Sequence, residues 1–196
     1  MSINVTVLPP PPSVLQQVVT SINATNNEAA TKEVVLDPTG LLLGYKTKNK
    51  SFGSVYFNNN STSSVVATAN TYVLLSNTSY TLNVLSSNFS LTGAPSSRLT
   101  YNGSSSAVFK VSCNSSYLCA GANNQNISLQ LSQNGVLIPN SKASSSTQNA
   151  LMPRCASMDT IVTMAPSDYI ELQLTNTTAA NNVTVTDVNI NAYSLH

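Results

Sequence analysis

Short runs of alternating apolar and polar residues fill most of the chain from about residue 52 onward. Residues 127–132 and 170–175 alternate strictly, with isoleucine or leucine at every second position. A period of two places the apolar side chains on one face of a β-strand and the polar ones on the other. The pattern predicts strands at Ser54–Phe57, Ser64–Ala69, Tyr72–Leu75, Tyr80–Leu85, Leu99–Tyr101, Ala107–Cys113, Ile127–Ser132, Val136–Ile138, Thr160–Met164, Asp168–Thr175 and Val183–Ala192.

Turn signals separate several of these strands. Asn102-Gly103 and Asn134-Gly135 are strong hairpin signals, and the polar run Asn114–Ser116 predicts a further turn. In the last strand the apolar positions change phase near Asp187, which predicts a β-bulge there. We predict no helix of useful length after residue 50. About ten short strands in ~145 residues are typical of a jelly-roll β-sandwich or a closed barrel.

Residues 1–50 read differently and are expected to form an N-terminal arm, followed by one sandwich domain over residues 51–196. An extended segment, Ile3–Leu8, leads into Pro9–Pro12, which must be an extended polyproline spacer. Ser13 and Gln16 form a capping box that predicts a short amphipathic helix over Ser13–Ile22. Its apolar stripe consists of Val14, Leu15, Val18, Val19 and Ile22. Such a short helix is not stable alone, so the stripe is expected to dock on another surface.

Charge is sparse, with 8 Lys+Arg and 7 Asp+Glu in 196 residues, while Ser, Asn and Thr number 30, 25 and 21. A net charge of +1 gives no field for binding nucleic acid. No apolar run approaches the ~18 residues of a membrane span. Lys46, Lys48 and Lys50 form the one charge cluster, read as a solvated strand edge or as a patch for an acidic partner.

The cysteines and the amino terminus bear on the cellular compartment. The first residues show neither a basic region nor a long apolar one, so no signal peptide is expected. Three cysteines, Cys113, Cys119 and Cys155, make an odd number, which favours free thiols, although Cys113 and Cys119 are close enough in sequence for a bridge. Their spacing is a poor ligand set for zinc.

Candidate catalytic and metal-binding groups are few. Asp159 and Asp168 could form a glycosidase pair, and Asp168 with Glu171 a calcium site, but turn and strand positions explain these carboxylates better. A serine nucleophile needs a base, and the one histidine is His196. Arg98 and Arg154 are read as partners for the few carboxylates. We therefore expect that the protein is not an enzyme and binds no cofactor.

Three strand sequences carry a resemblance: Arg98–Gly103, Asn126–Val136 and Ala165–Leu172. They resemble the RLTYxG, LxxNG and GDYIEL patterns of a family of jelly-roll domains in bacteriophage virion proteins, similar to tumour necrosis factor (TNF) and C1q heads. The chain departs from the third pattern at Ser167, where a glycine is usual. The resemblance covers roughly residues 50–196, and its motifs are structural rather than catalytic.

The resemblance implies an all-β TNF/C1q-like jelly roll that forms homotrimers and acts as a capsid decoration or cement protein. The expected location is the virion surface, after synthesis in the host cytoplasm. The partner would be the major capsid protein or another virion protein, bound through the N-terminal arm. The alternative is a head- or tail-fibre knob that binds a host glycan, although the low aromatic content of 6% and the absence of Trp weigh against it.

Overall fold

The computed structural model of the chain describes residues 32–36, 42–47, 50–76, 80–93, 97–119, 124–149 and 152–195. The described residues belong to two units, one within residues 1–49 and the other Lys50–His196. In the first unit, β1 (Lys32–Leu36) and β2 (Leu42–Thr47) pair as an antiparallel hairpin, with Glu33 opposite Lys46. The predicted polyproline spacer and the helix Ser13–Ile22 lie outside the described residues, and the predicted arm boundary stays a prediction.

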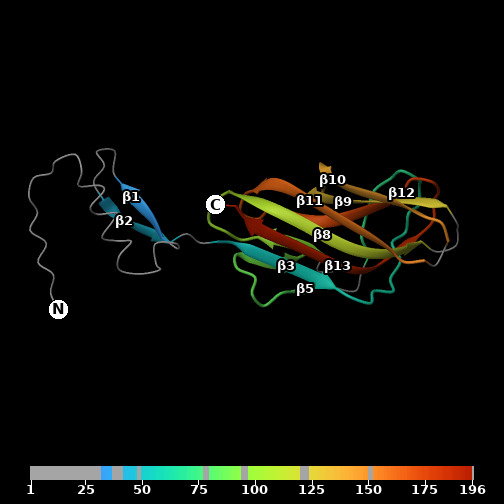
Figure 1. The fold of residues 1–196 in the computed structure, drawn as a ribbon, viewed down its shortest axis with the longest axis horizontal. Helices are drawn as coiled ribbons and strands as arrows, with labels where there is room; N and C mark the ends of the chain where they lie inside the picture. Colours follow the sequence, from blue (N-terminus) through green and yellow to red (C-terminus); the bar gives the residue numbers. More distant parts are fainter. Residues whose placement is uncertain are drawn as a thin grey trace, which may run out of the picture. The chain divides into compact units, whose positions relative to one another are not determined.

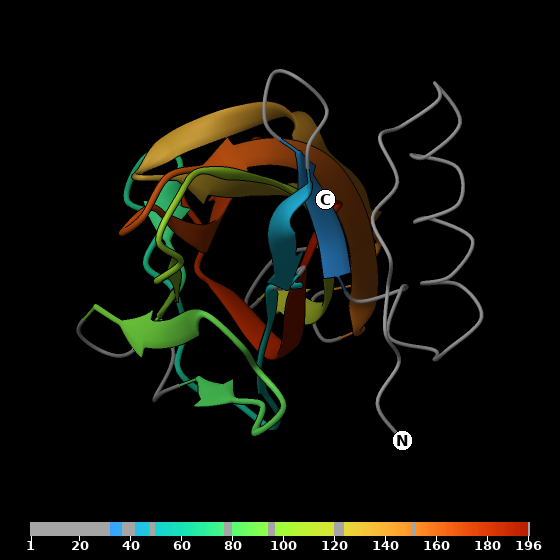
Figure 2. The same ribbon diagram turned by 90° about the vertical axis from the view of Figure 1, so that its left-hand side faces the viewer.

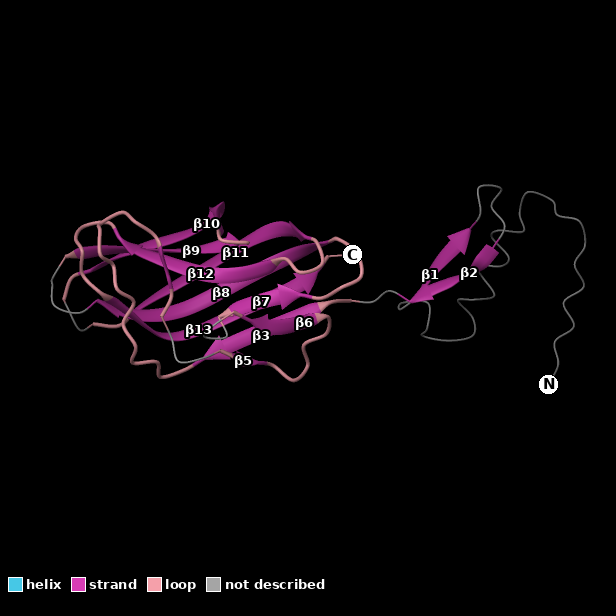
Figure 3. Ribbon diagram, turned by 180° about the vertical axis from the view of Figure 1, so that it is seen from behind, coloured by secondary structure: helices cyan, strands magenta, loops and turns pink. Residues whose placement is uncertain are grey.

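The second unit is a sandwich of two antiparallel sheets (Figure 1). Its strands are β3 (Phe52–Phe57), β4 (Val73–Leu74), β5 (Thr81–Leu82), β6 (Phe89–Thr92), β7 (Arg98–Tyr101), β8 (Ala107–Cys119), β9 (Gln125–Gln133), β10 (Val136–Thr147), β11 (Arg154–Met164), β12 (Tyr169–Asn176) and β13 (Val183–Ser194). One sheet has the order β10-β9-β12-β7-β6, with β4 beside β12, and the other has the order β11-β8-β13-β3-β5. No described residue is helical, so the predicted all-β jelly-roll fold is confirmed (Figure 3).

The core lies between the two sheets and is built from the apolar positions of the alternating strands. Figure 2 views the sandwich along its strands and shows the sheets curving around this interior. On β9 and β12 every predicted inward residue is buried: Ile127, Leu129, Leu131, Ile170, Leu172 and Leu174. Near the start of β8, Phe109 packs edge-on against both Phe89 and Tyr101, and these three rings have centroids 4.8–5.3 Å apart. Removal of these side chains from water is the main force that holds the two sheets together.

A predicted hairpin turn and a predicted β-bulge are both confirmed. Asn134 and Gly135 both have positive φ, at 53° and 80°, and join β9 to β10 as a two-residue hairpin. In β13 the register with β8 shifts between Val185 and Asp187, which is the predicted β-bulge. The bulge changes which residues face the core, so Val183 and Val185 on one side and Val188 and Ile190 on the other are all buried.

Other strand predictions were wrong in extent. Asn114–Ser116 does not turn but continues β8, because β11 and β13 on either side supply the hydrogen bonds that a turn would otherwise provide. Ser64–Ala69 is not a strand; it touches the sheet only through the Ser64–Val183 bridge. The strand Phe89–Thr92 was missed, although Phe89 and Leu91 alternate with Ser90 and Thr92; it has only four residues and is paired with β7.

Candidate interaction surface

Transverse rows of side chains cross the outer face of the five-stranded sheet. They arise because β8 pairs with β11 on one side and with β13 on the other, and β13 pairs in turn with β3. From one end of the sheet to the other, the residues that alternate away from the core form row 1 (Phe52, Tyr193, Lys110, Ile161), row 2 (Ser54, Asn191, Ser112, Asp159), row 3 (Tyr56, Asn189, Asn114, Ser157) and row 4 (Asp187, Ser116, Cys155).

Row 1 is mainly apolar. The rings of Phe52 and Tyr193 lie 5.0 Å apart between centroids. Tyr193 on β13 is 47% exposed, and Ile161 on the edge strand β11 is 61% exposed. These apolar side chains, in the strands on either side of β8, make this end of the sheet a suitable contact for another protein surface.

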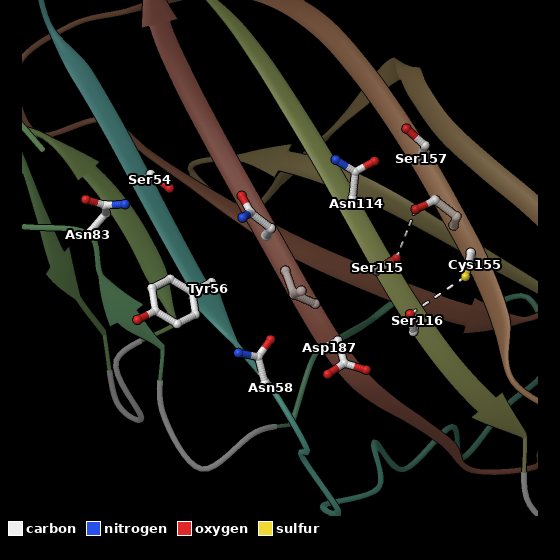
Figure 4. Close-up of a pocket in the computed structure, with 13 residues that line it drawn as sticks. Ser54, Tyr56, Asn58, Asn83, Asn114, Ser115, Ser116, Cys155, Ser157 and Asp187 are labelled. Carbon is white, nitrogen blue, oxygen red and sulfur yellow. Dashed lines mark hydrogen bonds between the residues drawn. The ribbon is translucent and has the colours of Figure 1, made fainter. Parts of the chain in front are cut away.

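Rows 3 and 4 line a shallow groove of about 660 Å³ (Figure 4). Tyr56 from β3, Asn114 from β8 and Asp187 from β13 surround it, with Cys155 and Ser157 from β11 on the far side. The hollow exists because most outward residues here are the small Ser, Asn and Cys, whereas larger side chains stand in row 1. The groove therefore presents amides and hydroxyls, which both donate and accept hydrogen bonds.

Charge on this face is almost balanced. Lys110 Nζ and Asp159 Oδ2 form an exposed ion pair at 3.4 Å. Asp187 has no cationic partner among the described residues; its carboxylate accepts hydrogen bonds from the Asn59 backbone N–H at 3.2 Å and from the Thr186 hydroxyl at 2.8 Å. The bulge therefore leaves the Asp187 carboxylate at the edge of the groove, where two hydrogen bonds fix its position but no described cation neutralises its charge.

The three thiols are free in the structure. Cys113 and Cys119 are both buried in β8, six residues apart. Strand geometry separates such residues by about 20 Å, so the disulfide left open by the sequence cannot form within this fold. Burial raises the pKa of the Cys113 thiol to about 12. Cys155 is exposed at the groove, with its sulfur 3.7 Å from the Ser116 hydroxyl.

A second polar cluster lies on the outer face of the other sheet. Arg98 Nε donates to Glu171 Oε2 at 3.1 Å, and the guanidinium stands 4.2 Å from the Tyr169 ring centroid. Glu171 is only 3% exposed, and it also accepts from the Ser132 hydroxyl at 3.4 Å. The predicted pairing of Arg98 with a carboxylate is confirmed, and this arrangement is a structural tie between β7, β9 and β12.

The candidate carboxylates have structural roles in the fold. Asp168 accepts hydrogen bonds from Asn134, Gln133 and the Ala165 backbone N–H at 2.7–3.0 Å. Burial alone would raise the pKa of Asp168, but these three donors outweigh it and hold the pKa below its ordinary value. Asp159 is engaged with Lys110, so the interpretation of both aspartates as structural agrees with their contacts. The described residues contain no group of three metal-ligating side chains.

The docking residues predicted in the arm, Val14, Leu15, Val18, Val19 and Ile22, lie outside the described residues, as does Lys48. Lys46 is in β2, and Lys50 is exposed just before β3.

Sequence reasoning missed the outer-face rows, because they depend on which strands are neighbours. The alternation within residues 154–164 and 107–119 was the available signal. No helix of the described residues is long and apolar enough to cross a membrane.

Neither a family model nor a curated protein matches the chain. Solved structures do match it. Murine APRIL is similar with a TM-score of 0.50 at 7% identity, covering 75% of this chain and all of that one. The PRD1 vertex protein P5 has a TM-score of 0.49 at 10% identity over 74% of this chain and 97% of that one. Eiger TNF from S. frugiperda has a TM-score of 0.48 at 14% identity, covering 74% of this chain and 94% of that one.

The sandwich is a jelly roll of the TNF and C1q type. Both sheets are antiparallel, and the match to murine APRIL spans the whole chain of that solved structure. At such low identity the likeness shows the fold alone. The surface rows and the groove therefore have to be interpreted from this chain's own residues.

Proposed function

We propose that the protein is a virion structural protein: a homotrimeric capsid decoration or cement protein, attached to the virion surface by its N-terminal segment. The outer face of the five-stranded sheet is the observation that carries the proposal. That face combines the apolar side chains of row 1 with neutral Ser and Asn in rows 2 and 3, and one internally paired Lys–Asp couple.

Burial of this face against other copies carries a small desolvation cost. Burying an unpaired charge is expensive, whereas amides and hydroxyls can pair across a contact. The core of a subunit interface is typically depleted of charge and enriched in aromatic residues, and rows 1 to 3 have that composition. The strand motifs that resemble those of phage jelly-roll proteins imply three copies in the assembly.

Attachment is assigned to the segment before the sandwich. This segment carries apolar residues at helical spacing, whereas the sandwich sequence alternates with the period of a strand. The apolar stripe consists of Val14, Leu15, Val18, Val19 and Ile22, and Pro9–Pro12 would act as a spacer before it. Among the described residues β1 and β2 form a sheet of two strands, and a two-stranded sheet is marginally stable in water alone. Docking on a capsid protein would supply the burial that both pieces require.

The groove favours a second candidate, a fibre knob that binds a neutral host glycan. Tyr56 offers a ring, and Asn58, Asn114 and Asn189 offer amides, which suit saccharide hydroxyls. The two candidates differ in what occupies the groove, because a subunit contact on this face would cover it. Glycan binding by the intact assembly would favour the knob.

The test of attachment uses two variants and particles that lack the protein. One variant lacks residues 1–44, and the other carries Val18→Asp with Ile22→Asp. Both should fold and form trimers through the sandwich, yet fail to bind the particles. Normal binding by both variants would place the attachment in the sandwich, and loss of folding in both would make the segment part of the core.

A further inference from the structure

A closed ring of three copies needs two different, complementary patches on each copy. A threefold contact joins one patch to another patch of the next copy, unlike the self-complementary contact of a twofold dimer. Rows 1 to 4 supply one patch. Its unneutralised charge is that of Asp187, since Lys110 and Asp159 pair with each other. The complementary patch should therefore carry a cation without a partner.

The side of the sandwich formed by β10 and β11 meets this requirement. Each of these strands forms one edge of its sheet, and the Thr160 hydroxyl of β11 donates to Asn140 Oδ1 of β10 at 2.8 Å. Two cations lie here, Lys142 on β10 and Arg154 on β11. Neither has a carboxylate partner among the described residues, whereas Arg98 and Lys110 are both paired.

Arg154 is the stronger of the two candidates. Its Nε is buried and has no hydrogen-bond partner in the described part of the chain. A guanidinium has five N–H donors and a geometry suited to a carboxylate. Because Nε is buried within the protomer, a carboxylate from outside would meet the terminal Nη nitrogens of this half-buried arginine.

The strand register places the two charges at the same height along the sandwich. Asp187 and Cys155 both lie opposite Ser116, and Arg154 lies opposite the next residue of β8, Tyr117. Rotation about an axis parallel to the strands keeps every residue at its own height. In a ring around such an axis, Arg154 of one copy and Asp187 of the next therefore come to the same level.

We propose that Arg154 of each copy pairs with Asp187 of the adjacent copy, so that the β10–β11 side of one jelly roll seats on the outer face of the next one's five-stranded sheet. This inference rests on the proposed trimer. The bulge at Val185–Asp187 has a direct role in it, since it holds the carboxylate at the groove edge through Asn59 and Thr186.

The experiment measures trimer dissociation by analytical ultracentrifugation for Arg154→Glu, Asp187→Lys and the double variant, with thermal melting as a check on folding. Each single charge reversal should raise the protein concentration at which half of the trimers have dissociated by at least about tenfold. The reason is that a like-charge pair replaces an attractive one. The double variant should return to within about threefold of wild type, because the pair is restored with opposite polarity.

Lys142→Glu is the matched control, because it changes the charge of the same side by the same amount at a different position. Its effect should be clearly smaller than that of Arg154→Glu. Equal effects of the two, unchanged trimers in both single variants, or no recovery in the double variant would each overturn the pair while leaving the trimer in place. A wild-type monomer at all concentrations would overturn the proposed trimer itself.

Discussion

Ser167 donates its backbone N–H to the Tyr101 carbonyl at 2.7 Å while its own φ is +76°. This bond fixes the turn between β11 and β12 in a conformation that L-residues rarely adopt. Ser167 is the position at which the chain departs from the glycine of the GDYIEL pattern. The structure gives the physical reason for that glycine, and for the strain that the serine carries.

Ser167→Gly should stabilise the protein by about 0.5–1 kcal/mol, because removal of the Cβ relieves strain that exceeds the added entropy of the unfolded chain. Urea unfolding measures the change. Ser157→Gly is the matched control, since Ser157 lies in extended β11, where the same substitution should destabilise. Equal effects of the two substitutions would contradict the assignment of strain to the turn.

Breaking the Arg98–Glu171 pair should be costly. Arg98→Met leaves a carboxylate that is 3% exposed without its cation, and we expect a loss of about 1–3 kcal/mol, reduced from the fully buried case because Arg98 itself is partly exposed. Lys110→Met breaks the exposed pair with Asp159 and should cost under about 1 kcal/mol. Similar losses of unfolding free energy in the two variants would contradict the assignment of the larger cost to the burial of Glu171.

Acid should weaken the fold through Asp168. Its pKa lies below the ordinary 3.8, so its contribution to the free energy of unfolding is fully present above about pH 5 and is lost as the pH falls through the folded-state value. Asp168→Asn should therefore show a smaller decline in stability between pH 5 and pH 2.5 than wild type. Parallel declines in the two proteins would argue against this assignment.

Thiol chemistry should distinguish one cysteine from the other two. Folded protein, diluted until its trimers dissociate, should react with a maleimide at Cys155 alone, since Cys113 and Cys119 are buried and the pKa of each thiol is raised by burial. The trimer should protect Cys155, because the proposed subunit contact covers the groove. Cys155→Ser should abolish the labelling, and reductant should leave the melting temperature unchanged. Two or three labels on the folded protein would mean that β8 opens readily.

The strands that sequence reasoning predicted best are those with one buried face. Residues 127–132 and 170–175 alternate strictly, and the phase change near Asp187 revealed the bulge. Asn114–Ser116 was misread, because its polar residues are stabilised by neighbouring strands distant in sequence. The outer-face rows, and the lack of a partner for Arg154 in the described part of the chain, depend on strand order and register, which local patterns do not contain. Lys46, Lys48 and Lys50 and the arm stripe stay predictions.

The proposed trimer joins its three copies through the outer face of the five-stranded sheet. Size-exclusion chromatography with light scattering at micromolar concentration tests this contact, with Asn114→Arg in row 3 and Thr71→Arg, at an exposed position before β4 and outside both proposed patches, as the control substitution. Wild type and Thr71→Arg should give about 60 kDa, three times the 20.6 kDa chain, and Asn114→Arg about 20 kDa. A 20 kDa wild type, or a 60 kDa Asn114→Arg variant, would contradict this contact.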